Sequence, residues 1–126
     1  MENQPKKILI VDDEEKLQQK LVDACSREGF VALGASNGEE GLSLALREHP
    51  DLILLDLEMP KMGGIEMLKQ LRKDEWGKNT PVIVLTNYDD SERVADVLEA
   101  GTYDYIIKSS RLEDIIKLVK QKLGLN

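Results

Sequence analysis

Short apolar runs alternate with amphipathic segments from one end of the chain to the other. Five runs have the length and the apolar content that are typical of β-strands. They cover residues 7–11, 30–35, 51–56, 82–86 and 103–108. The first run, Lys7–Val11, is continuously apolar after its lysine instead of alternating with polar residues. This pattern predicts a strand that is buried on both faces, as in a parallel sheet.

The segments between and after these runs carry apolar residues at helical spacing. Each segment has one stripe of the i, i+3, i+4 type, which predicts an amphipathic helix. The stripes consist of Leu17, Leu21, Ala24 and Cys25; Leu42, Ala45 and Leu46; Ile65, Leu68 and Leu71; Val94, Val97 and Leu98; and Leu112, Ile115, Ile116, Val119 and Leu123. We therefore expect five helices, one after each strand.

Local signals mark several of the helix ends. Gly29 and Gly101 each follow the last apolar position of a stripe, where glycine commonly closes a helix in the left-handed conformation. Asn37 and Ser110 each have a glutamate three residues later, which is the spacing of a capping box. These two residues are the predicted starting points of the second and the fifth helix.

Strands that alternate with helices predict a parallel sheet with helices packed on both faces. Five strand–helix units are too few for an eight-stranded barrel, which leaves the open, doubly wound α/β architecture. The chain has 126 residues, the length of one domain, and contains no linker, internal repeat or low-complexity segment. We therefore expect residues 1–126 to form a single α/β domain around one five-stranded parallel sheet.

Composition and charge exclude several function classes. The chain has 24 acidic and 17 basic residues, a net charge of −7, which argues against binding to nucleic-acid phosphates. Its apolar runs are far shorter than the ~18 residues that a membrane span needs. The single Cys25 excludes an intramolecular disulfide, and the apolar run after Lys7 stops at Asp12, too early for a signal peptide. We expect a cytoplasmic protein that contacts neither membrane nor nucleic acid.

Polar residues with chemical potential stand where the predicted strands end. In an open parallel sheet, ligands bind outside the carboxyl ends of the strands. The first strand ends at Asp12 and Asp13, and the third ends at Asp56. The fourth ends at Thr86 and the fifth at Lys108. Three carboxylates, one hydroxyl and one ammonium group are therefore expected to converge at one edge of the sheet.

These groups suit a phosphoryl acceptor that works with Mg²⁺. Packed carboxylates repel one another unless a cation lies between them, and Mg²⁺ prefers such hard oxygen ligands. A carboxylate beside Mg²⁺ can attack phosphorus and form an aspartyl phosphate, whose oxygens Lys108 and the Thr86 hydroxyl would stabilise. The adjacent Asp12 and Asp13 diverge and look like metal holders, so we expect Asp56 to be the nucleophile.

Three segments carry a resemblance to a known family. They are Ile8-Leu-Ile-Val-Asp-Asp-Glu14, Leu54-Leu-Asp-Leu-Glu-Met-Pro60 with Gly63-Gly64, and Ala100-Gly-Thr-Tyr-Asp-Tyr-Ile-Ile-Lys108. In this order, on an alternating strand–helix frame, they resemble the receiver domain of response regulators in two-component signal transduction. The resemblance covers essentially all 126 residues. It implies the flavodoxin-like (βα)₅ fold with strand order 2-1-3-4-5.

The resemblance also implies a role for each residue of the site. A histidine kinase would donate a phosphoryl group to Asp56 in a Mg²⁺-dependent reaction. Asp13 would bind the metal directly and Asp12 would bind it through water. Asp56 and the backbone carbonyl of Glu58 would complete the protein ligands, and Lys108 would pair with the phosphoryl group.

A conformational switch and its partners are implied in the same way. Thr86 would move toward the phosphoryl group, and Tyr105 would turn inward, which would reshape the face of the fourth helix, fifth strand and fifth helix. The domain would be a signalling module rather than an enzyme, catalysing only its own phosphotransfer and slow dephosphorylation. Its partners would be a histidine kinase or phosphotransfer protein, and a downstream protein target or an output domain that does not follow Asn126 here. A phosphorylation-driven homodimer is a further expected partnership.

Two residues depart from the family's pattern and leave a second function open. Ser109 stands where the family usually has a proline after the lysine, and Asn87 stands where it usually has a small residue. A cis bond before a residue other than proline costs about 2.5–4 kcal/mol, which favours a trans Lys108–Ser109 bond. The alternative function is a receiver-like docking module that no longer depends on phosphorylation.

Two other function classes fit the residues less well. An aspartate-dependent phosphatase usually has its nucleophile at the end of the first strand, a second aspartate two residues later, and a cap domain. Here Asp12 and Asp13 are adjacent and no cap is present. A nucleotide- or flavin-binding domain needs a Gly-rich or Ser/Thr-rich phosphate loop after the first strand, where this chain has Asp12-Asp13-Glu14.

Overall fold

Five parallel strands form the centre of the structure, a computed structural model that describes residues 4–87, 94–102 and 104–125. The strands are β1 (Lys7–Val11), β2 (Val31–Ala35), β3 (Leu52–Asp56), β4 (Val82–Thr86) and β5 (Asp104–Ile107). The helices are α1 (Glu15–Arg27), α2 (Gly38–Glu48), α3 (Gly64–Lys73), the short η1 (Gly77–Asn79), α4 (Val94–Ala100) and α5 (Leu112–Lys122). Within these described ranges, no helix is both long and apolar enough to cross a bilayer.

The sheet has the strand order β2-β1-β3-β4-β5, and every neighbouring pair is parallel. This confirms the doubly wound fold with order 2-1-3-4-5 that the sequence suggested. The central strand β3 is buried along its whole length because helices cover both of its faces. Its continuous apolar sequence is the pattern that this environment requires.

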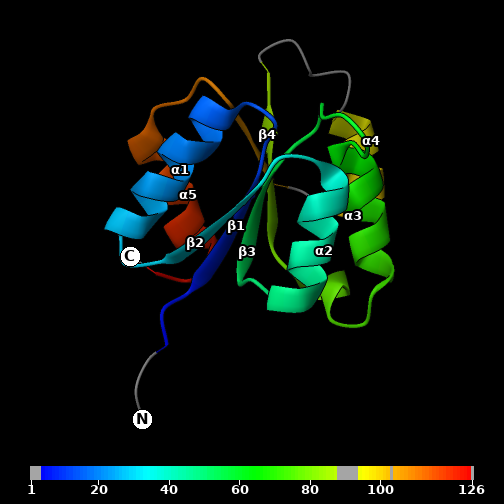
Figure 1. The fold of residues 1–126 in the computed structure, drawn as a ribbon, viewed down its shortest axis with the longest axis horizontal. Helices are drawn as coiled ribbons and strands as arrows, with labels where there is room; N and C mark the ends of the chain where they lie inside the picture. The colour runs from blue at the N-terminus through cyan, green and yellow to red at the C-terminus, as the bar shows by residue number, and fades with distance from the viewer. Residues whose placement is uncertain (1–3, 88–93, 103, 126) are drawn as a thin grey trace.

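Alternate residues of the strands build two cores, one on each face of the sheet. Leu9 and Ile53 face the layer of α2, α3 and α4, whereas Ile8 and Leu54 face α1 and α5. Figure 1 shows these two helical layers on opposite sides of the sheet. All four side chains are fully buried, so the register of each strand is fixed by the apolar residues on both of its faces.

Two of the predicted helix stripes each include an exposed leucine, and the side chain of Val94, also placed in the α4 stripe, lies outside the described part. Leu46 of α2 is 39% exposed and Leu98 of α4 is 44% exposed. In α2, Gly41 lies against the sheet, where an added Cβ atom would lie 2.8 Å from the Val11 side chain. The helix therefore packs on β1 through its small residues, and Leu46 is directed away from the core. In α4, Val97 makes the buried contact instead.

Most of the predicted helix ends are confirmed. Gly29 and Gly101 have φ angles of 91° and 113°, in the region that glycine tolerates and other residues avoid. The Asn37 side chain accepts a hydrogen bond from the backbone N–H three residues later, at 2.9 Å. The cap predicted at Ser110 is wrong, because α5 begins one residue later, with an extended Arg111 as its N-cap and without a side-chain cap.

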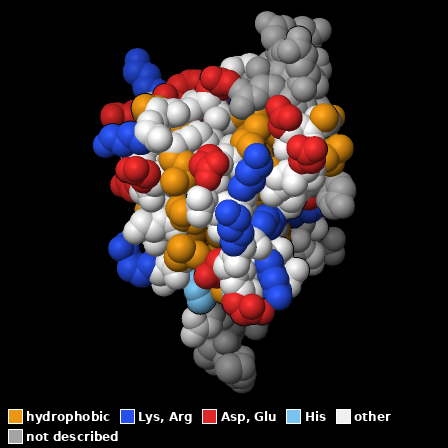
Figure 2. Space-filling model, turned by 90° about the vertical axis from the view of Figure 1, so that its right-hand side faces the viewer, with side chains coloured by type: hydrophobic (Ala, Val, Ile, Leu, Met, Phe, Trp, Pro, Cys, Tyr) orange, Lys and Arg blue, Asp and Glu red, His pale blue; other side chains and the backbone are white. Residues whose placement is uncertain are grey.

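The only histidine of the chain lies far from the strand ends that carry the aspartates. His49 is the C-cap of α2, three residues before the first residue of β3, and its ring stacks on Trp76 with centroids 4.2 Å apart. Figure 2 shows it in pale blue at the lower part of the molecule. The stack links α2 to the segment that precedes β4, and it leaves the opposite edge of the sheet without an imidazole.

Arg72 ties α3 to two other segments of the chain. Its Nε atom donates to the Gly101 carbonyl at 2.9 Å, and its Nη1 atom donates to the carbonyls of Gly77 and Thr80, each at 2.7 Å. These carbonyls belong to the first residue of η1, to its C-cap Thr80 before β4, and to the residue that follows α4. One guanidinium group thus ties the η1 turn before β4 to the turn that follows α4.

We expect Arg72→Met to lower the free energy of unfolding by about 2–3 kcal/mol, because three carbonyls lose a charged donor. Urea unfolding followed by circular dichroism measures the change. The matched control is Lys69→Met on the same helix, at an exposed position, and it should change the stability by less than about 0.5 kcal/mol. Equal losses in the two variants would contradict the role given to Arg72.

Candidate functional site

The carboxyl ends of four neighbouring strands bring the candidate residues to one edge of the sheet. Asp12 and Asp13 directly follow β1, and Asp56 is the last residue of β3. Thr86 is the last residue of β4 and Lys108 directly follows β5. The Lys108 backbone N–H donates to the Thr86 carbonyl at 2.6 Å, which holds these two strand ends together. Residues up to 96 positions apart in the sequence therefore meet here.

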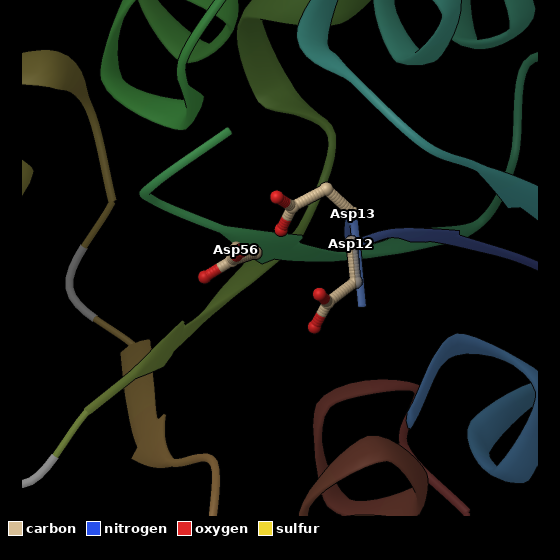
Figure 3. Close-up of side chains that lie close together, drawn as sticks. All are labelled: Asp12, Asp13 and Asp56. Carbon is tan, nitrogen blue, oxygen red and sulfur yellow. The ribbon is translucent and has the colours of Figure 1, made fainter. Parts of the chain in front are cut away.

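Three carboxylates form an acidic cluster at this edge. Asp12, Asp13 and Asp56 each place an oxygen within 4.8 Å of the other two. In Figure 3, the side chains of Asp12 and Asp13 leave the end of β1 in different directions, and both carboxylates turn to the side on which Asp56 lies. Asp12 and Asp56 are buried, at 0% and 3% exposure, whereas Asp13 is exposed. Such a set of oxygen ligands suits a hard divalent cation.

The Asp12 carboxylate is only partly satisfied by its neighbours. Its Oδ1 atom accepts from the Glu14 backbone N–H at 2.9 Å. Its Oδ2 atom is buried and accepts no hydrogen bond within the described part of the chain, although the Lys108 ammonium group lies 3.3 Å away as an ion-pair partner. A buried oxygen without a hydrogen bond is costly, so this atom has a free lone pair for a ligand in the cluster.

Lys108 is the cation of the site and contacts three acidic residues. Its Nζ atom lies 3.3 Å from Asp12, 3.4 Å from Asp56 and 2.7 Å from the Glu14 carboxylate. The Lys108 side chain is only 8% exposed. The sequence analysis did not identify Glu14 as a lysine partner. Its position directly after the aspartate pair was the only available signal, and the partner is 94 residues away.

Burial and crowding shift the protonation of these groups. Burial raises the pKa of Asp56 to about 7, with a further contribution from the Asp12 charge and an opposing one from Lys108. Burial also raises the pKa of Asp12, partly offset by the hydrogen bond from Glu14. For Lys108, burial favours the neutral form, but Glu14, Asp56 and Asp12 outweigh it and raise its pKa. Among the described residues, the two buried carboxylates of the cluster therefore outnumber the ammonium group that neutralises them.

The remaining candidate residues differ in how far they are exposed to solvent. Thr86 is buried, with 7% exposure, whereas Tyr105 on β5 is 48% exposed. Glu58 and Asn87 have exposed side chains in the segments that follow β3 and β4. No peptide bond in the described segments is cis, so the Lys108–Ser109 bond is trans. This agrees with the expectation from Ser109, which replaces the family's usual proline.

Comparison with known proteins identifies the family. The family model of the response regulator receiver domain matches residues 8–120. The chain is 34% identical over 119 residues to the sporulation initiation phosphotransferase F of Bacillus subtilis (strain 168), and the match covers 94% of both chains. It is 40% identical over 119 residues to the regulatory protein AtoC of Escherichia coli (strain K12), covering 94% of this chain. The chain therefore belongs to the receiver domain family of response regulators.

A solved structure agrees with this assignment. The CheY-like response regulator receiver domain protein from Methanospirillum hungatei JF-1 has a TM-score of 0.89 and 30% sequence identity, over 96% of this chain and 95% of that one. Receiver domains are signalling domains, which sets this chain apart from phosphatases and flavin-binding domains. The chain spans 25% of the length of AtoC and 42% and 48% of two further curated relatives, so it corresponds to one part of those proteins.

The raised pKa of Asp56 predicts a specific pH dependence of stability. A carboxyl group whose pKa is higher in the folded than in the unfolded state stabilises the fold at low pH, and this contribution is lost as pH rises through the folded value. In metal-free buffer, Asp56→Asn should therefore stabilise the domain more at pH 7.5 than at pH 4.5. Urea unfolding of both proteins in EDTA measures the difference. A stability difference that does not change with pH would contradict the prediction.

Proposed function

We propose that this receiver domain accepts a phosphoryl group on Asp56 from a phosphorylated histidine of a kinase or phosphotransfer protein, in a reaction that depends on Mg²⁺. The observation that carries the proposal is the cluster of Asp12, Asp13 and Asp56 with the Lys108 ammonium group 3.4 Å from Asp56. A nucleophile, a set of metal ligands and a fixed cation are the parts that phosphoryl transfer to a carboxylate needs.

The acidic cluster fits Mg²⁺ by its chemistry. Asp13 and Asp56 would hold the metal directly with carboxylate oxygens, Asp12 would hold it through water, and the backbone carbonyl of Glu58 would complete the protein ligands. The Asp12 Oδ2 atom, buried without a hydrogen bond, supports this assignment. Mg²⁺, when bound, neutralises charge on the carboxylates and on the phosphoryl oxygens. Histidine and cysteine ligands, which zinc prefers, are absent from the cluster.

The reaction would proceed by direct displacement at phosphorus. An Asp56 carboxylate oxygen attacks the phosphorus atom, the bond to the histidine nitrogen breaks, and the imidazole leaves with the electron pair. Asp56 must be ionised to attack, and its pKa of about 7 in the metal-free site means that a bound cation also favours the reactive form. Lys108 would then pair with one phosphoryl oxygen, and the Thr86 hydroxyl would donate to another.

The register of β4 and β5 supports a switch between Thr86 and Tyr105. Tyr105 pairs with Val84, and Thr86 pairs with Ile107, so the two candidate side chains lie on the same face, one diagonal step apart. Val84 belongs to the core beneath α2, α3 and α4, which places this face on the α4 side of the sheet. Movement of Thr86 toward a phosphoryl group would open space that the exposed Tyr105 ring can enter, and this would reshape the surface of α4, β5 and α5.

The geometry favours phosphorylation over a docking role that is independent of it. Ser109 replaces the usual proline and the bond before it is trans, yet Lys108 still reaches both Asp12 and Asp56. The position of the ammonium group therefore does not depend on a proline at 109. The switched surface would act on a downstream protein, on an output domain in a longer chain, or on a second copy of the domain.

Incubation with Mg²⁺ and acetyl phosphate should add one phosphoryl group to the protein, as measured by intact mass. Asp56→Asn and chelation of the metal should each abolish the adduct, and Asp23→Asn, at an exposed position of α1, should leave it unchanged. The adduct should be labile to base, as expected of an acyl phosphate. An adduct that survives Asp56→Asn would overturn the assignment of the nucleophile, and no adduct in the wild type would favour the docking role.

The switch predicts a change at Tyr105 on activation. With Mg²⁺ and beryllofluoride, the Tyr105 ring should lose most of the solvent access that its 48% exposure gives it. Broadening of its assigned NMR resonances by a soluble paramagnetic probe measures this access. In Thr86→Ala the ring should stay accessible although beryllofluoride still binds. Unchanged accessibility of Tyr105 in the activated wild type would contradict the switch.

A further inference from the structure

The Gln18 side chain makes contacts that the functions discussed so far do not use. From α1 its amide nitrogen donates to the backbone carbonyl of Asp12 at 2.8 Å and to that of Ala35 at 2.9 Å, and the Ser36 hydroxyl lies 3.3 Å away. Both close partners are carbonyl acceptors, so the NH₂ group must face them and its two protons are both used. The Ala35 carbonyl also accepts from the Asp12 backbone N–H at 3.0 Å. Gln18 thus joins the ends of β1 and β2.

The orientation of the Asp12 carbonyl affects the geometry of the acidic cluster. It belongs to the peptide group between Asp12 and Asp13, so holding its oxygen fixes the plane of that group. The plane sets the ψ angle of Asp12 and the φ angle of Asp13, and through them the directions of the two side chains. The three carboxylates meet within 4.8 Å only if both directions are right. A rotation of this one peptide group would separate Asp13 from Asp56.

Gly34 provides the space that the Gln18 amide occupies. A Cβ atom at this position of β2 would overlap the Gln18 amide oxygen and would lie 3.0 Å from its Cδ atom. The three nearest atoms to such a Cβ all belong to Gln18, and its flexible side chain can move away. The backbone of Gly34 is not in the left-handed region. A methyl group here would therefore displace Gln18 while leaving the strand intact.

We propose that Gln18 and Gly34 form a positioning pair that orients the Asp12–Asp13 peptide and thereby sets the affinity of the acidic cluster for Mg²⁺. The two close hydrogen bonds of Gln18 go to backbone carbonyls, so the pair acts through the backbone. Removal of a group that orients a metal ligand by hydrogen bonding, without binding the metal itself, typically lowers metal affinity about 10-fold to 100-fold. The inference rests on the proposed Mg²⁺ site for its effect on affinity, and on the metal-free contacts for the orientation itself.

A double-mutant cycle on Mg²⁺ binding tests the pair, with Mg²⁺ alone titrated against backbone NMR resonances. Gln18→Ala and Gly34→Ala should each weaken Mg²⁺ binding by about tenfold. The double variant should bind no more weakly than Gln18→Ala, because the methyl group added on β2 then has no amide left to displace. Gln18→Met, which keeps the length of the side chain but donates no hydrogen bond, should match Gln18→Ala. Wild-type affinity in Gly34→Ala, or losses that multiply in the double variant, would overturn the proposal.

A metal-free measurement separates this inference from the proposed function. The Asp12 carbonyl ¹³C shift and the Asp13 amide shift should move in Gly34→Ala and in Gln18→Met. Both shifts should stay in place in Gln19→Ala, whose exposed amide donates to Asp23 on the same helix. If the wild type binds no Mg²⁺, the proposed function fails while these shifts still decide whether Gln18 orients the peptide. Unmoved shifts in Gly34→Ala and Gln18→Met would reject the positioning role by themselves.

Discussion

The mutual repulsion of Asp12 and Asp56 is the constraint on which the site depends. Both carboxylates are almost completely buried, and they lie close enough to share a ligand. Burial in a medium of low dielectric penalises each charge, and proximity penalises the pair further. Among the described residues, the ammonium group of Lys108 opposes the carboxylates at this edge and also pairs with Glu14. The fold therefore holds in place an arrangement that gains stability from any added positive charge or bound proton.

The packing and pairing of the strands determine where the site lies, and they maintain this imbalance of charge. The apolar residues of β1, β3 and β4 anchor the strands from both faces, so the strand ends cannot move apart to relieve the repulsion. Parallel pairing then forces the residues that follow these strands onto one edge, whatever their charge. Local features that cost stability and are maintained by well-packed surroundings are typical of functional sites. The receiver family to which the chain belongs uses the same frame for signalling.

The sequence predicted the elements well because the strands are continuous apolar runs and the helix ends carry strong local signals. The strand order did not follow from periodicity and came only from the family resemblance. Leu46 and Leu98 were misplaced because a three-residue stripe does not define the width of a helix face, and because Gly41, which sets the approach of α2 to the sheet, has no side chain to signal its burial. The sequence did not predict the contact between Lys108 and Glu14 or the hydrogen bond from the Gln18 amide to the Asp12 carbonyl. Both depend on how long side chains from separate segments extend in the folded structure.

In the described part of the chain, the strand ends that carry the site are held by more hydrogen bonds on the β2 side of the sheet than on the β5 side. Toward β2, Gln18 and the Asp12 backbone N–H both bond to the Ala35 carbonyl, so the end of β1 is held by side chain and backbone together. Toward β5, the Lys108 backbone N–H donates to the Thr86 carbonyl. The Thr86 side chain is buried, whereas its diagonal neighbour Tyr105 is half exposed. If the charge at Asp56 changed, the hydrogen bonds to Ala35 would hold the end of β1 in place on the β2 side. On the β5 side, the side chains of Thr86 and Tyr105 would be the ones to move. If the proposed phosphoryl transfer takes place, we would therefore expect the rearrangement to be directed toward α4, β5 and α5, since a movement on that side would leave intact the hydrogen bonds from Gln18 and the Asp12 backbone that hold the end of β1.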